Sequence, residues 1–161
     1  MKREKHKALR RAAELGGIAA AAAACDQLIK RRIRRAAVGA VLWRGPGLMI
    51  VRAENRGMAF GLLAKGGYLR VLAVVLAAAL LPALLWARRR AFVRSRPERF
   101  AFALLLGGAA GNMLDRLLLG TVTDYVRMTA VSFPVFNLAD VCITGGVSLL
   151  ALRILRERDE G

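Results

Sequence analysis

The residues best suited to chemistry are aspartates that lie within or beside apolar segments: Asp115, Asp124 and Asp140. Two carboxylates held together in a poorly hydrated site cannot both ionise easily, so one keeps a proton while the other can accept one from a shared water. Such a pair can hydrolyse a peptide bond, because one carboxylate deprotonates the attacking water and the other donates to the oxyanion or the leaving amine. The sequence therefore permits aspartyl-protease chemistry.

Other hydrolytic mechanisms are excluded by residue type. The single histidine, His6, lies in the charged N-terminal segment, so neither an HExxH zinc motif nor a Ser-His or Cys-His arrangement can form. The serines are Ser95, Ser132 and Ser148, and none stands in a GxSxG motif. If the chain hydrolyses a substrate, it must use carboxylates.

The spacing of neighbouring polar residues indicates how the aspartates are presented. Asn112, Asp115 and Arg116 are three and four residues apart, so a helix places them on one face. Arg116 is expected to pair with Asp115 and keep it ionised, which gives Asp115 a supporting role. Asn137 and Asp140 are also three apart, whereas Asp124 lies in a polar turn that follows Gly120 and can return towards the same face.

Apolar blocks must position these side chains. Residues 71–87 carry no charge, and 17 residues at about 1.5 Å each just span a hydrocarbon core of roughly 30 Å. The other blocks contain polar residues, which usually face a protein interior in a membrane. Gly107 and Gly111 form a GxxxG spacing that lets another helix approach closely. We predict one α-helical membrane domain over residues 1–161, with four transmembrane helices at 12–29, 67–88, 98–116 and 135–155.

Residues 36–66 differ from these blocks. Glycine and proline separate short β-prone pieces such as VGAVLW and LMIVRA. We expect a small β-sheet at the outer membrane surface here rather than another span.

The net charge of +16 raises the possibility of nucleic-acid binding. The basic residues, however, lie between apolar blocks, and two Trp and two Tyr are too few for interleaved stacking. We therefore expect membrane lipids rather than nucleic acid as partners. Four spans place both termini and the basic linker 88–99 on one side, which we expect to be cytoplasmic. The basic cluster at 30–35 stands against this bias, on the outer side.

Spacing alone leaves three interpretations of the buried polar residues open. They can tie helices together, form a catalytic site, or carry ions or protons in a small coupled transporter.

Ordered sequence blocks resemble the lipoprotein signal peptidase (signal peptidase II) family over roughly residues 15–155. Five blocks follow one another in the family's order. They are DQLIK (26–30), NRGMAFG (55–61), GGAAGNMLDR (107–116), GTVTDY (120–125) and FPVFNLAD (133–140).

This resemblance implies an aspartyl endopeptidase of the bacterial inner membrane, with its active site near the outer leaflet. The implied catalytic pair is Asp124 and Asp140, and Asp26 and Lys30 match a structural motif. The implied substrate is a prolipoprotein cleaved before a cysteine that bears a diacylglyceryl group. We expect no metal or cofactor, and a monomer. The residues that match site-shaping and substrate-holding positions are Asn55, Gly57, Asn112, Asp115, Arg116 and Asn137.

Four features depart from the family pattern. Tyr125 stands where the family often has Phe, Cys25 where an aliphatic residue is commoner, and Met58 where a small residue is frequent. The basic cluster at 30–35 is also heavier than the resemblance leads us to expect.

Overall fold

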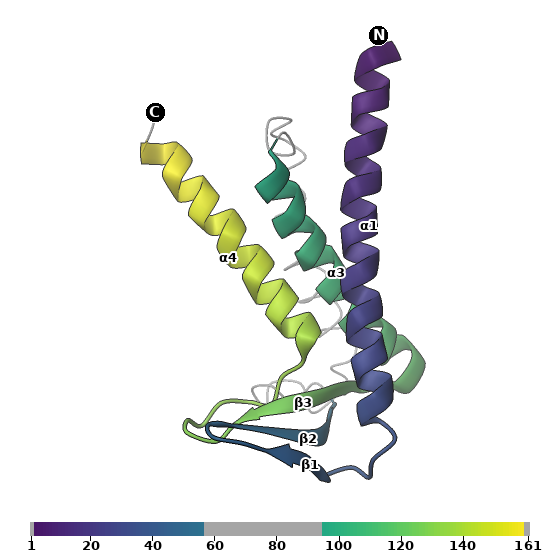
Figure 1. The fold of residues 1–161 in the computed structure, drawn as a ribbon, viewed down its shortest axis with the longest axis vertical. Coiled ribbons are helices and arrows are strands. Elements are labelled where there is room, and N and C mark those ends of the chain that lie inside the picture. The colour runs from purple at the N-terminus through teal and green to yellow at the C-terminus, as the bar shows by residue number, and fades with distance from the viewer. Residues whose placement is uncertain (1, 57–94, 160–161) are drawn as a thin grey trace.

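The computed structural model describes residues 2–56 and 95–159, and the span expected at 67–88 lies outside them. In the described part, long helices rise from one side of a small antiparallel sheet (Figure 1). The helices are α1 (Lys2–Ile33), α3 (Arg96–Leu119) and α4 (Leu138–Asp159). The strands, in sheet order, are β1 (Val41–Arg44), β2 (Leu48–Asn55) and β3 (Val122–Met128). A mostly helical fold with a small sheet confirms the coarse architecture expected from the sequence.

Helix α3 lies between α1 and α4 and packs against both (Figure 1). Glycines permit the close approach: a Cβ at Gly107 would lie 2.6 Å from the main-chain oxygen of Ala19 in α1. Likewise, a Cβ at Gly146 in α4 would lie 2.5 Å from the main-chain oxygen of Ala101 in α3. The glycine at 107 therefore serves the purpose predicted for it, and the helix that approaches is α1. The buried apolar cluster comprises Ala101, Phe102, Leu105 and Leu150.

The helices differ in length from the predicted ones, for local reasons. Helix α1 extends the predicted 12–29 to Lys2, because its first residues are mostly good helix formers. Helix α3 starts two residues earlier than predicted, because Ser95 and Glu98 form a reciprocal capping box. Its end is set by Gly120, which adopts a left-handed conformation with φ of 73°. Helix α4 begins at Leu138 rather than 135, because the preceding Asn137 caps it.

Strand β3 corrects the prediction of a polar turn around Asp124. The segment Val122–Met128 is rich in β-branched and aromatic residues, which favour a strand. It pairs antiparallel with β2, placing Ala53 opposite Asp124 and Asn55 opposite Val122. Asn55 is thus a diagonal neighbour of Asp124 across the two strands. The sheet predicted within 36–66 therefore gains a third strand that comes from after α3.

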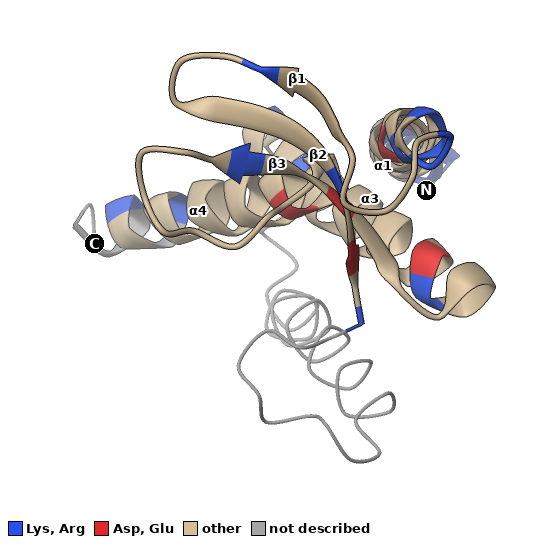
Figure 2. Cartoon of the chain, turned by 90° about the horizontal axis from the view of Figure 1, so that it is seen from below, with Lys and Arg blue, Asp and Glu red and all other residues tan. Residues whose placement is uncertain are grey.

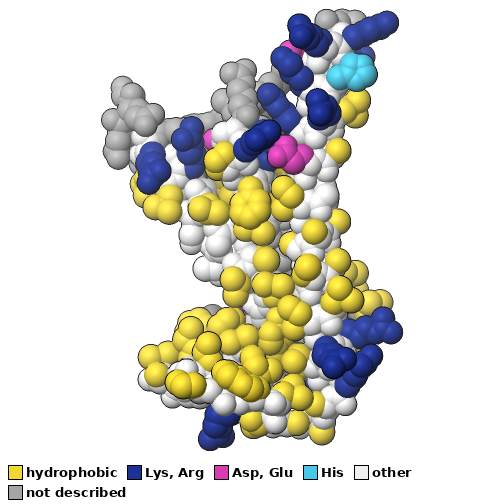
Figure 3. Space-filling model, in the orientation of Figure 1, with side chains coloured by type: hydrophobic (Ala, Val, Ile, Leu, Met, Phe, Trp, Pro, Cys, Tyr) yellow, Lys and Arg dark blue, Asp and Glu magenta, His cyan; other side chains and the backbone are white. Residues whose placement is uncertain are grey.

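Apolar side chains cover much of the outer surface of the helices (Figure 3). Among the described helices, α1 and α3 are long and apolar enough to cross a bilayer. Large exposed apolar surfaces are unusual on a soluble monomer and suit contact with lipid. Examples of exposed side chains are Leu28, Leu117, Leu118, Leu149 and Leu152.

Candidate active site

Asp124 is buried on β3, where two amides hold its carboxylate. The Asn55 Nδ2 atom donates to Oδ2 at 3.0 Å, and the Asn137 Nδ2 atom donates to Oδ1 at 2.6 Å. Burial, reinforced by the nearby charge of Asp140, raises the pKa of Asp124 to about 6, although both amide hydrogen bonds act to lower it. The surroundings of Asp124 therefore favour its protonated form.

Asp140 lies in the first turn of α4, where the backbone N–H groups of a helix attract negative charge. It forms a capping box with Asn137: the Asp140 N–H donates to Asn137 Oδ1 at 3.0 Å, and the Asn137 N–H donates to Asp140 Oδ2 at 3.1 Å. The other carboxylate oxygen, Oδ1, accepts from Asn112 Nδ2 at 2.8 Å. The direction of the Asp140 side chain is thus fixed by two hydrogen bonds, one to each carboxylate oxygen.

Two asparagines, Asn112 and Asn137, link Asp124 to Asp140 through hydrogen bonds. Asn137 donates to Asp124 through its side chain and to Asp140 through its main chain. Asn112 donates to Asp140, while its oxygen accepts from Lys30 at 2.8 Å and from Asn137 at 3.1 Å. Because those two donors occupy the amide oxygen, the amide nitrogen of Asn112 must face Asp140. The structure therefore brings Asp124 and Asp140 to one network, through residues on α3 and before α4.

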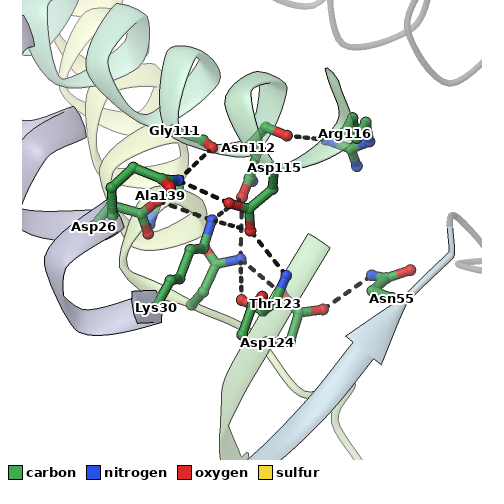
Figure 4. A network of polar contacts seen from close by, with 12 residues as sticks. Asp26, Lys30, Asn55, Gly111, Asn112, Asp115, Arg116, Thr123, Asp124 and Ala139 are labelled. Atoms are coloured by element: carbon green, nitrogen blue, oxygen red, sulfur yellow. Dashed lines mark hydrogen bonds and ion pairs between the residues drawn. The ribbon is translucent and has the colours of Figure 1, made fainter. Parts of the chain in front are cut away.

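Asp115 is buried beside this pair and is surrounded by donors (Figure 4). Its Oδ1 atom accepts from Gln27 at 2.9 Å and from Arg34 at 3.0 Å. Its Oδ2 atom accepts from the main-chain N–H of Thr123 at 2.9 Å and lies 3.3 Å from Lys30 Nζ. A carboxylate so fully occupied is suited to holding β3 in place next to Asp124, because Thr123 immediately precedes that aspartate.

Asp26 and Lys30 form a buried ion pair of 2.8 Å between positions one turn apart on α1. The three protons of the Lys30 ammonium face Asp26, Asn112 and Asp115, so its donors are saturated (Figure 4). Asp26 also accepts the main-chain N–H of Ala139 at 3.0 Å, which ties α1 to the start of α4.

Arg116 corrects one prediction. Among the described residues, Asp115 forms its ion pairs with Lys30 and Arg34, and Arg116 donates instead to the main-chain oxygen of Asn112 at 3.3 Å. The reason is geometric: Lys30, near the end of α1, and Arg34, just after that helix, lie against Asp115 and supply two cations from a distant part of the chain. Gly57, also expected at the site, lies outside the described residues.

Several supporting residues were missed in the sequence. The first two N–H groups of α4 are accepted by Tyr125 Oη, at 3.1 Å from Leu138 N, and by Asp26. Burial raises the pKa of Tyr125 to about 12, so its hydroxyl stays neutral. Gln27 and Arg34, which hold Asp115, were signalled only by lying in or near the DQLIK block. Within residues 2–56 and 95–159, no three His, Cys, Asp or Glu side chains converge as metal ligands.

Known proteins resemble this chain along most of its length. Residues 18–156 match the family model described as Signal peptidase (SPase) II. A lipoprotein signal peptidase from Caldicellulosiruptor bescii is 36% identical over 137 residues, covering 84% of this chain and 86% of the relative. A lipoprotein signal peptidase from Brucella ovis is 42% identical over 115 residues, covering 66% of this chain and 67% of the relative.

Solved structures show the same likeness in three dimensions. One bacterial membrane enzyme superposes with a TM-score of 0.72 and 28% identity, covering 89% of this chain and 88% of the other. A second superposes with a TM-score of 0.74 and 29% identity, covering 86% and 90%. By sequence over residues 18–156, and with a fold shared with bacterial membrane enzymes, this chain belongs to the signal peptidase II family.

Proposed function

We propose that this peptidase removes signal peptides from prolipoproteins with Asp124 and Asp140 as its catalytic pair, cutting just before a cysteine that bears a diacylglyceryl group. Membership of the signal peptidase II family supports prolipoprotein processing and gives no support to an ion-coupled transporter. The observation that carries the residue assignment is the bridge made by Asn137, which donates to both carboxylates.

The different surroundings of the two aspartates support a division of roles in the proposed reaction. In this mechanism the proton of the pair starts on Asp124, whose pKa is raised to about 6 by burial and by the nearby charge of Asp140. Ionised Asp140 takes a proton from a water molecule, and the resulting hydroxide attacks the carbonyl carbon before the cysteine. Asp124 donates its proton to the carbonyl oxygen. When the C–N bond breaks, the amine of the cysteine receives a proton from Asp140. One hydroxyl group of the tetrahedral intermediate returns a proton to Asp124 as the new carboxyl group forms.

The remaining aspartate and the amides serve this pair. Asp115 holds the strand of Asp124 through the Thr123 N–H, and Asn112 directs Asp140. Asn55 keeps one oxygen of Asp124 occupied, and Arg116, which is partly exposed near the pair, is placed to hold the substrate backbone. Asn137 belongs to both halves of the site.

The placement in the membrane is part of the proposal. Four helices cross the inner membrane of a bacterium, both termini are cytoplasmic, and the sheet lies at the outer surface of one membrane domain. Both aspartates lie where the helices meet the sheet, which favours an active site near the outer leaflet. The lipid chains of the substrate then stay in the bilayer while its peptide enters over the sheet, and one copy of the chain suffices.

A cleavage assay in detergent micelles tests this function. Purified wild type should cut a lipidated precursor peptide with no ion gradient, and an unlipidated copy should be cut poorly. Asp124→Asn and Asp140→Asn should each fold and lose cleavage. Glu4→Gln should keep it, because Glu4 is an exposed acid in the first turn of α1, at the opposite end of that helix from Lys30. Full activity of either aspartate variant would remove that residue from the pair, and failure of wild type to cut would refute the function.

A further inference from the structure

The edge strand β1 and the segment that leads to α4 expose large apolar side chains. All of β1 is exposed, with Val41, Leu42 and Trp43 at 52%, 47% and 54% of full exposure. Val131 and Phe133, in the segment that leads to α4, are also more than half exposed. An exposed apolar edge strand promotes aggregation in water. The apolar lobe, formed by β1 with Val131 and Phe133, therefore needs a partner.

Arginines border this apolar lobe. Arg31, Arg32 and Arg35 are exposed where α1 ends, and Arg44 and Arg127 are exposed on β1 and β3. None of the five forms an ion pair with a described residue. Seen from below, the arrowheads of β1 and β3 are basic (Figure 2), and basic side chains lie at the foot of α1 beside the apolar surface (Figure 3).

Other cations close to these five arginines are paired, so the excess of unpaired positive charge is confined to the border of the lobe. Lys30 and Arg34 belong to the buried network, and Arg52 pairs with Glu54 at 2.7 Å. Within the cluster at 30–35, only the exposed arginines therefore remain without an ion-pair partner among the described residues. They lie on the side expected to be the outer one, against the usual excess of Lys and Arg on the cytoplasmic side. A favourable interaction with the helix C-terminus explains one or two such residues, but it does not explain cations on the strands.

The chemistry of the lobe fits one partner. Tryptophan beside aliphatic residues settles at the boundary between head groups and acyl chains, and guanidinium groups bind phosphate with paired hydrogen bonds. We propose that the lobe enters the outer leaflet through Trp43 and its apolar neighbours, and that Arg31, Arg32 and Arg35 bind the phosphates of anionic phospholipids. The enzyme would thereby gather anionic lipid around its substrate entrance. This inference rests on the proposed placement of the sheet at the outer surface, and it does not depend on the cleavage reaction.

Quenching of Trp43 fluorescence tests the preference. The full chain with Trp86→Phe, which leaves Trp43 as its only tryptophan, is placed in vesicles of equal phosphatidylcholine and phosphatidylglycerol. Bromine is attached to one lipid or the other, so the membrane composition stays constant. Each arginine near an anionic surface favours the anionic lipid about fivefold, so we expect brominated phosphatidylglycerol to quench at least about twice as strongly.

Two triple variants decide whether the arginines cause the preference for phosphatidylglycerol. Arg31→Gln/Arg32→Gln/Arg35→Gln should make both brominated lipids quench equally. The matched change of three exposed arginines at the other end of α1, Arg3→Gln/Arg10→Gln/Arg11→Gln, should keep the preference. Equal quenching in the unaltered background, or an unchanged preference in the first triple variant, would overturn the proposal.

A second measurement covers poor folding of the Trp86→Phe background. Lipids that co-purify with the otherwise unaltered chain and with both triple variants are quantified by mass spectrometry, and only the first triple variant should lose phosphatidylglycerol. Retention equal to that of the unaltered chain would refute the site. Both measurements can be made with Asp124→Asn, so a failure here is distinguishable from a failure of the cleavage assay.

Discussion

The side-chain nitrogen of Asn137 lies 2.6 Å from Asp124 Oδ1, and this bond spans two elements that approach the site from different directions. The same residue caps α4, so the position of Asp140 and the environment of Asp124 depend on one side chain. Loss of this amide should therefore affect both carboxylates at once.

Two substitutions of Asn137 separate its roles. Asn137→Ala loses both the helix cap and the amide donor, and it should be destabilised by about 1 kcal/mol or more. Asn137→Ser keeps a capping hydroxyl, so it should recover much of that stability. Both variants should lose activity about a hundredfold, as expected for removal of a preorganised donor. Thermal unfolding and kcat measured in the same detergent compare the two, and recovery of activity by Ser would contradict the donor role.

The pKa of Asp124 predicts how its replacement changes stability with pH. The folded state keeps this proton up to about pH 6, while the unfolded chain releases it near the ordinary value of 3.8. The folded state thus binds more protons in this window, and the contribution of Asp124 to stability falls as pH rises through it. Relative to wild type, Asp124→Asn should gain up to about 3 kcal/mol between pH values of about 4 and about 7. A difference in unfolding temperature that does not change with pH would contradict the assignment.

The contact of Gly111 with Asp26 predicts a steric requirement. A Cβ at Gly111 would lie 2.5 Å from Asp26 Oδ2, an atom already paired with Lys30. Gly111→Ala should therefore destabilise the protein by about 1–3 kcal/mol, as overpacking usually does. Gly145→Ala is the matched control, because nothing lies within 4 Å of its new Cβ, and it should be neutral or slightly stabilising. Equal unfolding temperatures for the two variants would refute the close contact.

The buried Lys30 predicts a large loss of stability when its charge is removed. Lys30→Met leaves Asp26 and Asp115 without their shared cation, and breaking a buried ion pair in this way costs about 3–5 kcal/mol. Lys7→Met removes an exposed ion pair from the same helix and should change little. Comparable behaviour of both variants in thermal unfolding would show that the network contributes no more than a surface pair.

Tyr125 predicts a split between binding and turnover. Tyr125→Phe removes the acceptor of the Leu138 N–H and should cost about 1 kcal/mol of stability. Because that N–H begins the helix of Asp140, we expect kcat to fall about five-fold with little change in KM. A rise in KM at constant kcat would place the hydroxyl in substrate binding instead.

Local pattern predicted the elements better than their mutual contacts. The GxxxG spacing and the Asn-x-x-Asp spacing concern residues within one helical turn, and both proved to have structural counterparts at Gly107 and Asn137. Strand β3 was missed because a seven-residue segment next to a helix-ending glycine has too little period to distinguish it from a turn.

Contacts across the chain could not be read from spacing. Arg116 is adjacent to Asp115 in sequence, yet Arg34, 81 positions away, is the arginine that bonds it. Likewise the link from Asp26 to Ala139 joins positions separated by 113 residues. These partners are decided by the packing of α1 against α3 and α4. The glycines that permit this packing do not indicate which cation will lie beside Asp115.

The first three N–H groups of α4 are accepted by side chains from three places: Tyr125 on β3, Asp26 on α1 and Asn137 before the helix itself. Helix starts usually fray because such groups depend on water, whereas this one is anchored on all sides. In the proposed reaction the substrate therefore meets an Asp140 carboxylate that already points in a fixed direction, and little binding energy is spent on ordering this part of the enzyme.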